Sequence, residues 1–315
     1  MKILVLNCGS SSVKYKLINT QSTETLAEGA IEKIGLDGAN LKFKLADGSK
    51  KVITSDIPDH NVAIKNILHI LIDETDGCIA NFNEINAVGH RLVHGGEKFN
   101  SSVLITPEVI AKVKECYPLA PLHNPVNIAG VEAIEQILPG VQQVGVFDTA
   151  FHQTMPAKAY MYALPYNFYT EFGVRKYGFH GTSHRYVSRR SCEFLGLDFE
   201  SQKIITCHIG NGGSIAAIAN GVSIDTSMGL TPVDGIIMGT RSGSIDPGIF
   251  TFLMERNGLT ATDVQNIINK ESGVKGISGI SSDMRDIDAA IAKGDERAIL
   301  AEDMYIYSIT KYIGS

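Results

Sequence analysis

Residues 204–219 read IITCHIGNGGSIAAIA, and residues 3–18 read ILVLNCGSSSVKYKLI. Each stretch starts with a run of apolar or β-prone residues, passes through a polar residue into a turn of small residues, and continues as an alternating strand. The pattern predicts two β-hairpins built on one plan, in which Asn7 aligns with His208. A plan that recurs in the second half of the chain indicates a duplicated α/β domain.

The segments around these hairpins alternate between helix and strand. Apolar residues at helical spacing predict a helix within 60–75, and apolar runs predict strands at 85–89 and 141–147. Thr106-Pro107 and Asn124-Pro125 are expected to open two more helices as N-cap and first-turn pairs. The alternation predicts an α/β layered fold with at least a partly parallel sheet.

The chain length of 315 residues fits two domains better than one, because single cores stop growing near about 250 residues. We expect an N-terminal lobe at 1–149 and a C-terminal lobe at 150–315. The last helical pattern, around 299–313, is followed by no strand pattern. The second lobe is therefore expected to be incomplete at its C-terminal side.

Composition and charge disfavour several classes of protein. The net charge is −6 and the sequence holds no Lys/Arg run, so the footprint of a nucleic-acid binder is missing. No stretch reaches the ~18–20 apolar residues of a membrane span. The five cysteines lack zinc or redox spacing, which is typical of reduced thiols in a cytoplasmic protein. The sequence also lacks a Walker loop, a GxGxxG fingerprint and a GxSxG elbow.

The tips of the two predicted hairpins are candidate phosphate-binding turns. Small residues let backbone N–H groups approach an anion closely, and both tips consist of them, at 10–12 and at 210–213. Lys14 adds a positive charge beside the first tip. Each tip could also be a plain tight hairpin, but two equivalent tips favour phosphate binding.

The stretch GHRLVHGGE at 89–97 follows the predicted strand at 85–89. Arginine is seldom buried unpaired, and its planar fork suits a carboxylate or phosphoryl group, so Arg91 is a candidate ligand-binding residue. The alternative is an exposed arginine flanked by solvated histidines.

Three further stretches each place one ionisable residue among Gly, Thr and Ser at an expected strand end: Asp148, His180 and Arg241. Singly, Asp148 could cap a helix and His180 could be a satisfied core histidine. Together with Arg91 they predict a cationic cleft suited to phosphoryl transfer. A carboxylate acceptor is already ionised at neutral pH and needs no general base.

Seven stretches, taken in order, resemble the signature motifs of the acetate kinase family: 7–14, 89–97, 147–150, 177–184, 208–213, 238–243 and 283–285. That family belongs to the actin, hexokinase and heat-shock-chaperone ATPase superfamily, with two duplicated ribonuclease-H-like lobes around a nucleotide cleft. The resemblance implies direct in-line transfer of the γ-phosphoryl group of ATP to acetate, giving acetyl phosphate and ADP. It also implies Mg²⁺ and a homodimer.

The resemblance assigns roles to individual residues. Arg91 resembles the binder of the carboxylate or acyl phosphate, His180 and Arg241 the transition-state stabilisers, and Asp148 the catalytic aspartate, for which we favour an orienting role. Asn7 resembles the residue of the magnesium shell. The remaining matches are nucleotide contacts at Lys14, His208, Ile209, Gly210, Asn211, Gly212, Asp283, Met284 and Arg285, and a methyl pocket of Val93, Leu122, Phe179 and Pro232.

Two alternatives to an acetate kinase remain open at this point. The family continues past residue 315 with an adenine-side turn and a metal-binding glutamate, so a non-catalytic nucleotide or acyl-phosphate binding module is one alternative. The other is a propionate or short-chain acyl kinase, because an apolar pocket discriminates a methylene group by only ~1–3 kcal/mol.

Overall fold

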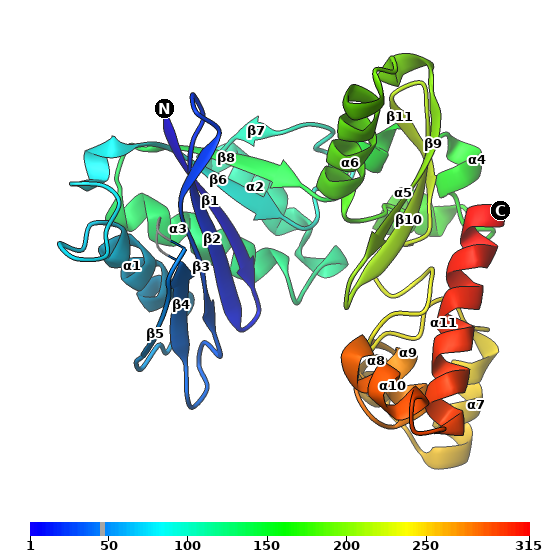
Figure 1. Ribbon diagram of the computed structural model, residues 1–315. Helices are drawn as coiled ribbons and strands as arrows, with labels where there is room; N and C mark the ends of the chain where they lie inside the picture. The colour runs from blue at the N-terminus through cyan, green and yellow to red at the C-terminus, as the bar shows by residue number, and fades with distance from the viewer. Residues whose placement is uncertain (45–47) are drawn as a thin grey trace. The chain divides into compact units, whose positions relative to one another are not determined.

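The computed structural model describes residues 1–44 and 48–315 (Figure 1). The chain divides into two compact units, unit 1 at Met1–Ala150 and unit 2 at Phe151–Ser315. Within the described ranges, no helix is long and apolar enough to cross a membrane.

Unit 1 is built on an eight-stranded sheet with the order β5-β4-β3-β2-β1-β6-β8-β7. Its strands are β1 (Lys2–Gly9), β2 (Ser12–Asn19), β3 (Glu24–Glu32), β4 (Asn40–Lys44), β5 (Lys50–Thr54), β6 (Ile85–Leu92), β7 (Val103–Leu104) and β8 (Gln142–Phe147). The strands from β1 to β5 pair antiparallel, whereas β1, β6 and β8 run parallel. The first predicted hairpin and the partly parallel sheet are confirmed.

The helices of unit 1 are α1 (His60–Leu71), α2 (Pro107–Glu115) and α3 (Asn124–Ile137), with short 3₁₀ turns η1 (Phe82–Glu84) and η2 (Tyr117–Leu119). Thr106 caps α2 as predicted, because its side chain accepts from the Val109 amide. The prediction that Asn124 caps the next helix is wrong. Asn124 is the first helical residue, and its side chain instead binds both backbone groups of His94.

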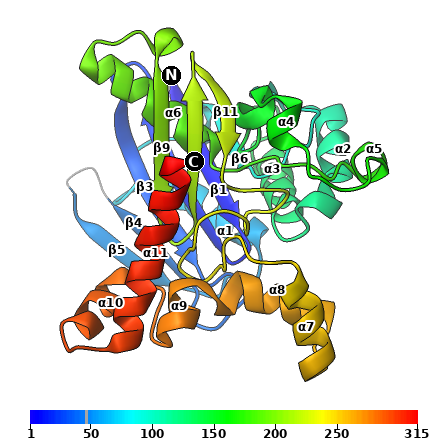
Figure 2. The ribbon, with the colours of Figure 1, turned by 90° about the vertical axis from the view of Figure 1, so that its right-hand side faces the viewer.

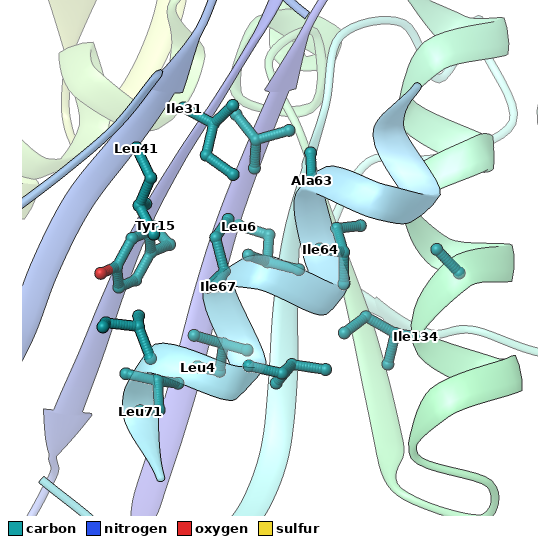
Figure 3. Packing of buried hydrophobic residues seen from close by; sticks show 14 of the residues in the cluster. Leu4, Leu6, Tyr15, Ile31, Leu41, Ala63, Ile64, Ile67, Leu71 and Ile134 are labelled. Carbon is teal, nitrogen blue, oxygen red and sulfur yellow. The ribbon is translucent and has the colours of Figure 1, made fainter. Parts of the chain in front are cut away.

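The core of unit 1 lies between the sheet and the helices α1 and α3. Figure 3 shows apolar side chains of α1, among them Ile64 and Ile67, in one cluster with Leu6 of β1 and Ile134 of α3. Each fully buried aliphatic side chain contributes roughly 1.5–3 kcal/mol. This packing holds β1 rigidly at the centre of the sheet, where it carries Asn7.

Unit 2 contains a three-stranded antiparallel sheet, β11-β10-β9. Its elements are β9 (Lys203–Ile209), β10 (Gly213–Ala219), β11 (Val222–Thr226), α4 (Ala157–Tyr160), α5 (Asn167–Phe172), α6 (Gly181–Leu195), α7 (Gly248–Asn257), α8 (Ala261–Asn266), α9 (Gly273–Ser278), α10 (Met284–Ile291) and α11 (Glu296–Gly314), with η3 (Ala150–Thr154), η4 (Phe199–Ser201) and η5 (Ile267–Glu271). Helix α11, red in Figure 2, packs against α9 and α10 around buried Val274, Ile287 and Ala298. The predicted hairpin at 204–219 is confirmed.

The two hairpins differ in their tips. Gly9 pairs with Ser12 in unit 1, whereas Ile209 pairs with Gly213 in unit 2, so the second tip is one residue longer. Among the described residues of unit 2, the three antiparallel strands are not followed by parallel ones. Within the described residues, the similarity between the two units therefore covers the antiparallel strands and does not include the parallel strands of unit 1.

Two expected strand ends in unit 2 are wrong. His180 and Arg241 lie in irregular segments rather than after strands. The physical reason is the backbone of nearby glycines, because Gly178 has φ 72° and Gly243 has φ 71°. Such positive φ values are incompatible with a continuous strand.

Candidate active site

Three polar side chains meet at one edge of the sheet of unit 1. Asn7 is near the end of β1, Arg91 near the end of β6, and Asp148 directly after β8. Because these neighbouring strands are parallel, their carboxyl ends lie at the same edge. The sequence predicted this placement for Arg91 and Asp148.

Hydrogen bonds join these three side chains. The Arg91 guanidinium donates from Nε to Asp148 Oδ1 at 3.0 Å and from Nη2 to Asp148 Oδ2 at 2.6 Å. Its Nη1 donates to Asn7 Oδ1 at 3.1 Å. The two-point contact with a carboxylate fixes both the position and the plane of the fork.

The electrostatic environment of Arg91 and Asp148 favours a protonated Arg91 beside a carboxylate whose two oxygens both accept hydrogen bonds. Burial lowers the pKa of Arg91, but the attraction and the hydrogen bonds of Asp148 outweigh it, and the net shift is upward. The side chain of Asp148 is only 3% exposed, whereas that of Arg91 is 39% exposed. Both carboxylate oxygens accept from Arg91, so Asp148 is better placed to orient the arginine than to accept a proton from a ligand.

Lys14 belongs to the same region of unit 1. It is paired directly opposite Asn7 in the register of β1 and β2, and directly opposite residues share a face of the sheet. Lys14 is exposed, as is Ser11 in the hairpin tip. The first candidate turn therefore stands next to the Arg91 cluster.

The segment after β6 is fastened to α3 by two buried asparagines. Asn127 accepts from the Val93 amide at 3.0 Å and donates to the Cys8 carbonyl at 2.8 Å. Val93 is 8% exposed, while Leu122 is 63% exposed. Of the two candidate pocket residues in unit 1, Val93 is thus buried and held by Asn127, whereas Leu122 is exposed.

His180 has an unusual backbone in unit 2. It precedes α6 with φ 57° and ψ 20°, the left-handed conformation, which non-glycine residues seldom adopt and which recurs at functional sites. Its Nδ1 lies 2.9 Å from Ser214 Oγ, and its ring stacks on that of His208 with centroids 4.0 Å apart. The alternative in which His180 is a core histidine does not fit its partial burial or the approach of its ring to the glycine turn.

The glycine turn brings His180 and Arg241 together. A Cβ placed on Gly212 would lie 3.3 Å from Arg241 Nη1 and 3.8 Å from His180 Nε2. Arg241 also donates to the Pro232 carbonyl at 3.1 Å, and burial lowers its pKa. The amide of Gly210 is used within the turn, since it donates to the Gly212 carbonyl at 3.1 Å.

The segment at 283–285 lies near the same turn. A Cβ on Gly239 would approach both Asn211 Oδ1 and the Cβ of Ser282. Gly239 therefore lies beside both the glycine turn and the residues that precede α10. Asp283 caps α10 and binds the Arg285 side chain, which, together with the Arg285 amide, lowers its pKa to about 2. Both residues are solvent-accessible.

The candidate residues divide between the units. Unit 1 holds Asn7, Lys14, Arg91, Val93, Leu122 and Asp148; unit 2 holds Phe179, His180, His208, Ile209, Gly210, Asn211, Gly212, Pro232, Arg241, Asp283, Met284 and Arg285. Phe179 is buried and Pro232 is half-buried within unit 2. The described residues contain no group of three or more His, Cys, Asp or Glu arranged to hold a metal ion.

Sequence reasoning missed the residues that hold the functional side chains in place. Asn127 and Ser214 are both buried and bond to candidate site segments. A polar residue on the core face of a helix or strand is the signal that could have identified them, because buried polar groups need partners.

Comparisons with known proteins identify the family of the chain. The model of the acetokinase family matches residues 2–315. Acetate kinase of Porphyromonas gingivalis is 62% identical over all 315 residues, which correspond to 79% of that protein. Acetate kinase of Phocaeicola vulgatus is also 62% identical, with the same coverage.

Solved structures give the same answer for the fold. The crystal structure of the P. gingivalis acetate kinase matches with a TM-score of 0.95 and 62% identity, covering 99% of this chain and 78% of that one. A propionate kinase from Francisella tularensis subsp. tularensis SCHU S4 matches with a TM-score of 0.94 and 43% identity, covering 99% and 79%. These likenesses confirm the resemblance and the α/β fold class expected from the motifs. With one family model spanning almost every residue and relatives of this identity over the full chain, the chain belongs to the acetokinase family.

Proposed function

We propose that the chain catalyses the reversible, direct in-line transfer of the γ-phosphoryl group of ATP to acetate, giving acetyl phosphate and ADP. The observation that carries the proposal is the Arg91 fork, gripped at two points by buried Asp148 at the carboxyl edge of a parallel sheet. Membership of the acetokinase family supports acetate as the acceptor.

The proposed chemistry divides between positioning and charge neutralisation. Arg91 binds the acetate carboxylate or the acyl phosphate. A carboxylic acid with a pKa of about 4 is ionised at neutral pH, so no base is needed to generate the nucleophile. Asp148 orients Arg91, and Arg91 in turn positions the attacking oxygen of acetate. The oxygen is therefore placed by the site and is not deprotonated by it.

In unit 2, Arg241 and His180 stabilise the charge that spreads over the phosphoryl oxygens. Their proximity to Gly212 supports this role. The turn at 208–212 binds phosphate through its backbone, except that the Gly210 amide is already bonded within the turn. Lys14 and the stretch 283–285 serve as further nucleotide contacts.

Magnesium fits this site only as an ion carried mainly by the nucleotide. Asn7 offers one carbonyl oxygen, which accepts from Arg91 and keeps a second lone pair. Mg²⁺ commonly keeps water and binds phosphate oxygens, with few protein ligands. When bound, the ion would neutralise charge on the phosphates, with Asn7 as the residue of this chain beside it.

Propionate is the second candidate acceptor. The specific observation is the likeness to a propionate kinase at a TM-score of 0.94. Val93 is 8% exposed and Leu122 is 63% exposed, so we propose that these two pocket residues do not enclose the acyl group tightly. We propose acetate as the preferred acceptor and propionate as a slower one.

Two further properties follow from the proposed reaction and the family. ATP is a co-substrate found in the cytoplasm, so we propose a cytoplasmic location. We also propose a homodimer, which is supported by the exposed apolar side chains of Tyr186, Phe194 and Leu195 on α6.

The test is an assay of ATP formation from acetyl phosphate and ADP, with and without Mg²⁺. Arg91→Ala and Arg241→Ala should each lower kcat by about 100-fold or more while the fold persists. Arg256→Ala is the matched control, because Arg256 is an exposed arginine on α7, away from the residues proposed for the site. Near-normal turnover of either site variant would refute its proposed role, and absence of acetyl phosphate-dependent turnover in the unaltered chain would leave the binding module as the better account.

A further inference from the structure

The hydroxyl of Ser214 lies between two imidazole rings in unit 2. Ser214 is on β10 and is completely buried. Its Oγ is 2.9 Å from His180 Nδ1 and 2.7 Å from His184 Nε2. A serine hydroxyl has one proton and two lone pairs, so it can donate to one ring and accept from the other.

His184 fixes this hydroxyl from behind. His184 is buried, and its Nδ1 lies 2.8 Å from Thr206 Oγ1. Burial, and then the neighbouring histidines, lower its pKa to about 3. A neutral imidazole carries one N–H and one acceptor nitrogen, and Thr206 and Ser214 supply one partner for each. Thr206, His184 and Ser214 therefore form a line of hydrogen bonds that holds Ser214 Oγ in one place.

His180 is held on several sides at once. Its backbone is in the left-handed conformation at the start of α6, and one ring face stacks on His208 at an interplanar angle of 24°. With Nδ1 directed at Ser214, the opposite ring edge faces the glycine turn, where a Cβ on Gly212 would lie 3.7 Å from Cε1 and 3.8 Å from Nε2. A half-turn of the ring about its Cβ–Cγ bond would put Cδ2 in the place of Nδ1, facing Ser214, and Cε1 in the place of Nε2.

We propose that Ser214 is a positioning residue, whose hydroxyl holds the His180 ring with its Nε2 edge toward the phosphoryl group. The proposal rests on the proposed function, because it adds a residue to the same phosphoryl-transfer site. Ser214 acts through His180 and does not touch the substrate. Both directions of the Ser214–His180 hydrogen bond leave Nε2 as the nitrogen on the turn side.

The kinetic test compares two buried serines. Ser214→Ala should lower kcat about 10-fold or more in both directions and leave KM for acetate within about twofold, because a loss of orientation acts on the transition state. Ser188→Ala is the matched control. Ser188 is equally buried on α6, but in the described part of the chain its hydroxyl donates to carbonyls of its own helix, those of His184 and Arg185.

A second pair of variants separates the hydroxyl from packing. Ser214→Thr and Ser214→Val have nearly the same volume and differ by the hydroxyl, and both are suited to a strand. The threonine variant should turn over at least about five times faster than the valine variant. Equal rates in this pair would overturn the proposal, even if Ser214→Ala is slow or fails to fold.

A readout that needs no turnover is nitrogen NMR of the histidine rings. Loss of the Ser214 hydroxyl should change the Nδ1 signal of His180, whereas Ser188→Ala should leave it unchanged. An unchanged His180 signal in Ser214→Ala would overturn the proposal. If the unaltered chain shows no kinase activity, the proposed function fails, while the NMR result still decides whether Ser214 holds the ring.

Discussion

Replacing Asp148 by Asn tests the orienting role of this residue directly. The change keeps the shape of the side chain but removes its charge and one of its two acceptors. In the native structure both acceptors bind Arg91, at 3.0 and 2.6 Å. The NH₂ group of the asparagine is a donor and would face a guanidinium N–H, which is also a donor. Arg91 would therefore lose one of the two hydrogen bonds that fix the plane of its guanidinium.

The size of the effect follows from burial and exposure. Hydrogen bonds to charged groups contribute roughly 1.5–3 kcal/mol, and Asp148 is 3% exposed, but Arg91 is 39% exposed and regains water when released. We therefore expect a loss of about 1–2 kcal/mol in the free energy of unfolding. A displaced arginine should cost about 100-fold in kcat, because a displacement near 1 Å has that consequence.

The assay is steady-state turnover in both directions between pH 6 and 9, with thermal melting alongside. An orienting role predicts that the pH profile of Asp148→Asn is the wild-type profile scaled down by one factor. Asp225→Asn is the control, because Asp225 forms an exposed ion pair with Lys176. A kcat within about threefold of wild type, or a profile that loses an ionisation present in the wild type, would refute the orienting role.

Three further predictions concern the pocket, the glycine turn and the buried histidines. Val93→Ala should raise the ratio of kcat/KM for propionate over acetate by about 10-fold, whereas exposed Leu122→Ala should change it less; an unchanged ratio would exclude Val93 from the pocket. Gly212→Ala would place a Cβ 3.3 Å from Arg241 Nη1, so we expect a higher KM for ADP without loss of folding, and a normal KM would contradict a phosphate at this turn. Burial lowers the pKa of both His90 and His94 to about 4, below the ~6.5 of an unfolded histidine, so stability is fully present above pH ~6.5 and should fall as the pH drops toward about 4. Denaturant titration across this range should show that fall, and His90→Gln should flatten it; an unchanged slope would contradict a buried neutral ring.

The sequence predicted the parts of the fold that depend on local pattern. The hairpins at 3–18 and 204–219 have alternating polarity and small-residue turns, and both form as expected. The parallel strands that bring Arg91 and Asp148 together also follow from pattern, because buried parallel strands read as apolar runs.

The parts that the sequence did not predict depend on contacts between distant residues. His180 was expected after a strand, but positive φ at Gly178 and at His180 itself breaks the extended backbone. Asn124 was expected as a cap because of the proline that follows it, yet its amide is used to fasten the backbone of His94. The pairing of Ser214 with two histidines depends on β10 lying next to the start of α6, which no local pattern encodes.

The central claim is that this chain transfers a phosphoryl group to a carboxylate oxygen of acetate. The most direct measurement incubates the protein with ATP, Mg²⁺ and acetate that carries heavy oxygen in both carboxyl positions, and follows the products by phosphorus NMR. Such a transfer predicts acetyl phosphate with heavy oxygen at the position that bridges the carbonyl carbon and the phosphorus, formed together with ADP. Acetyl phosphate without heavy oxygen in that bridge, or ADP formed without any acetyl phosphate, would contradict the account.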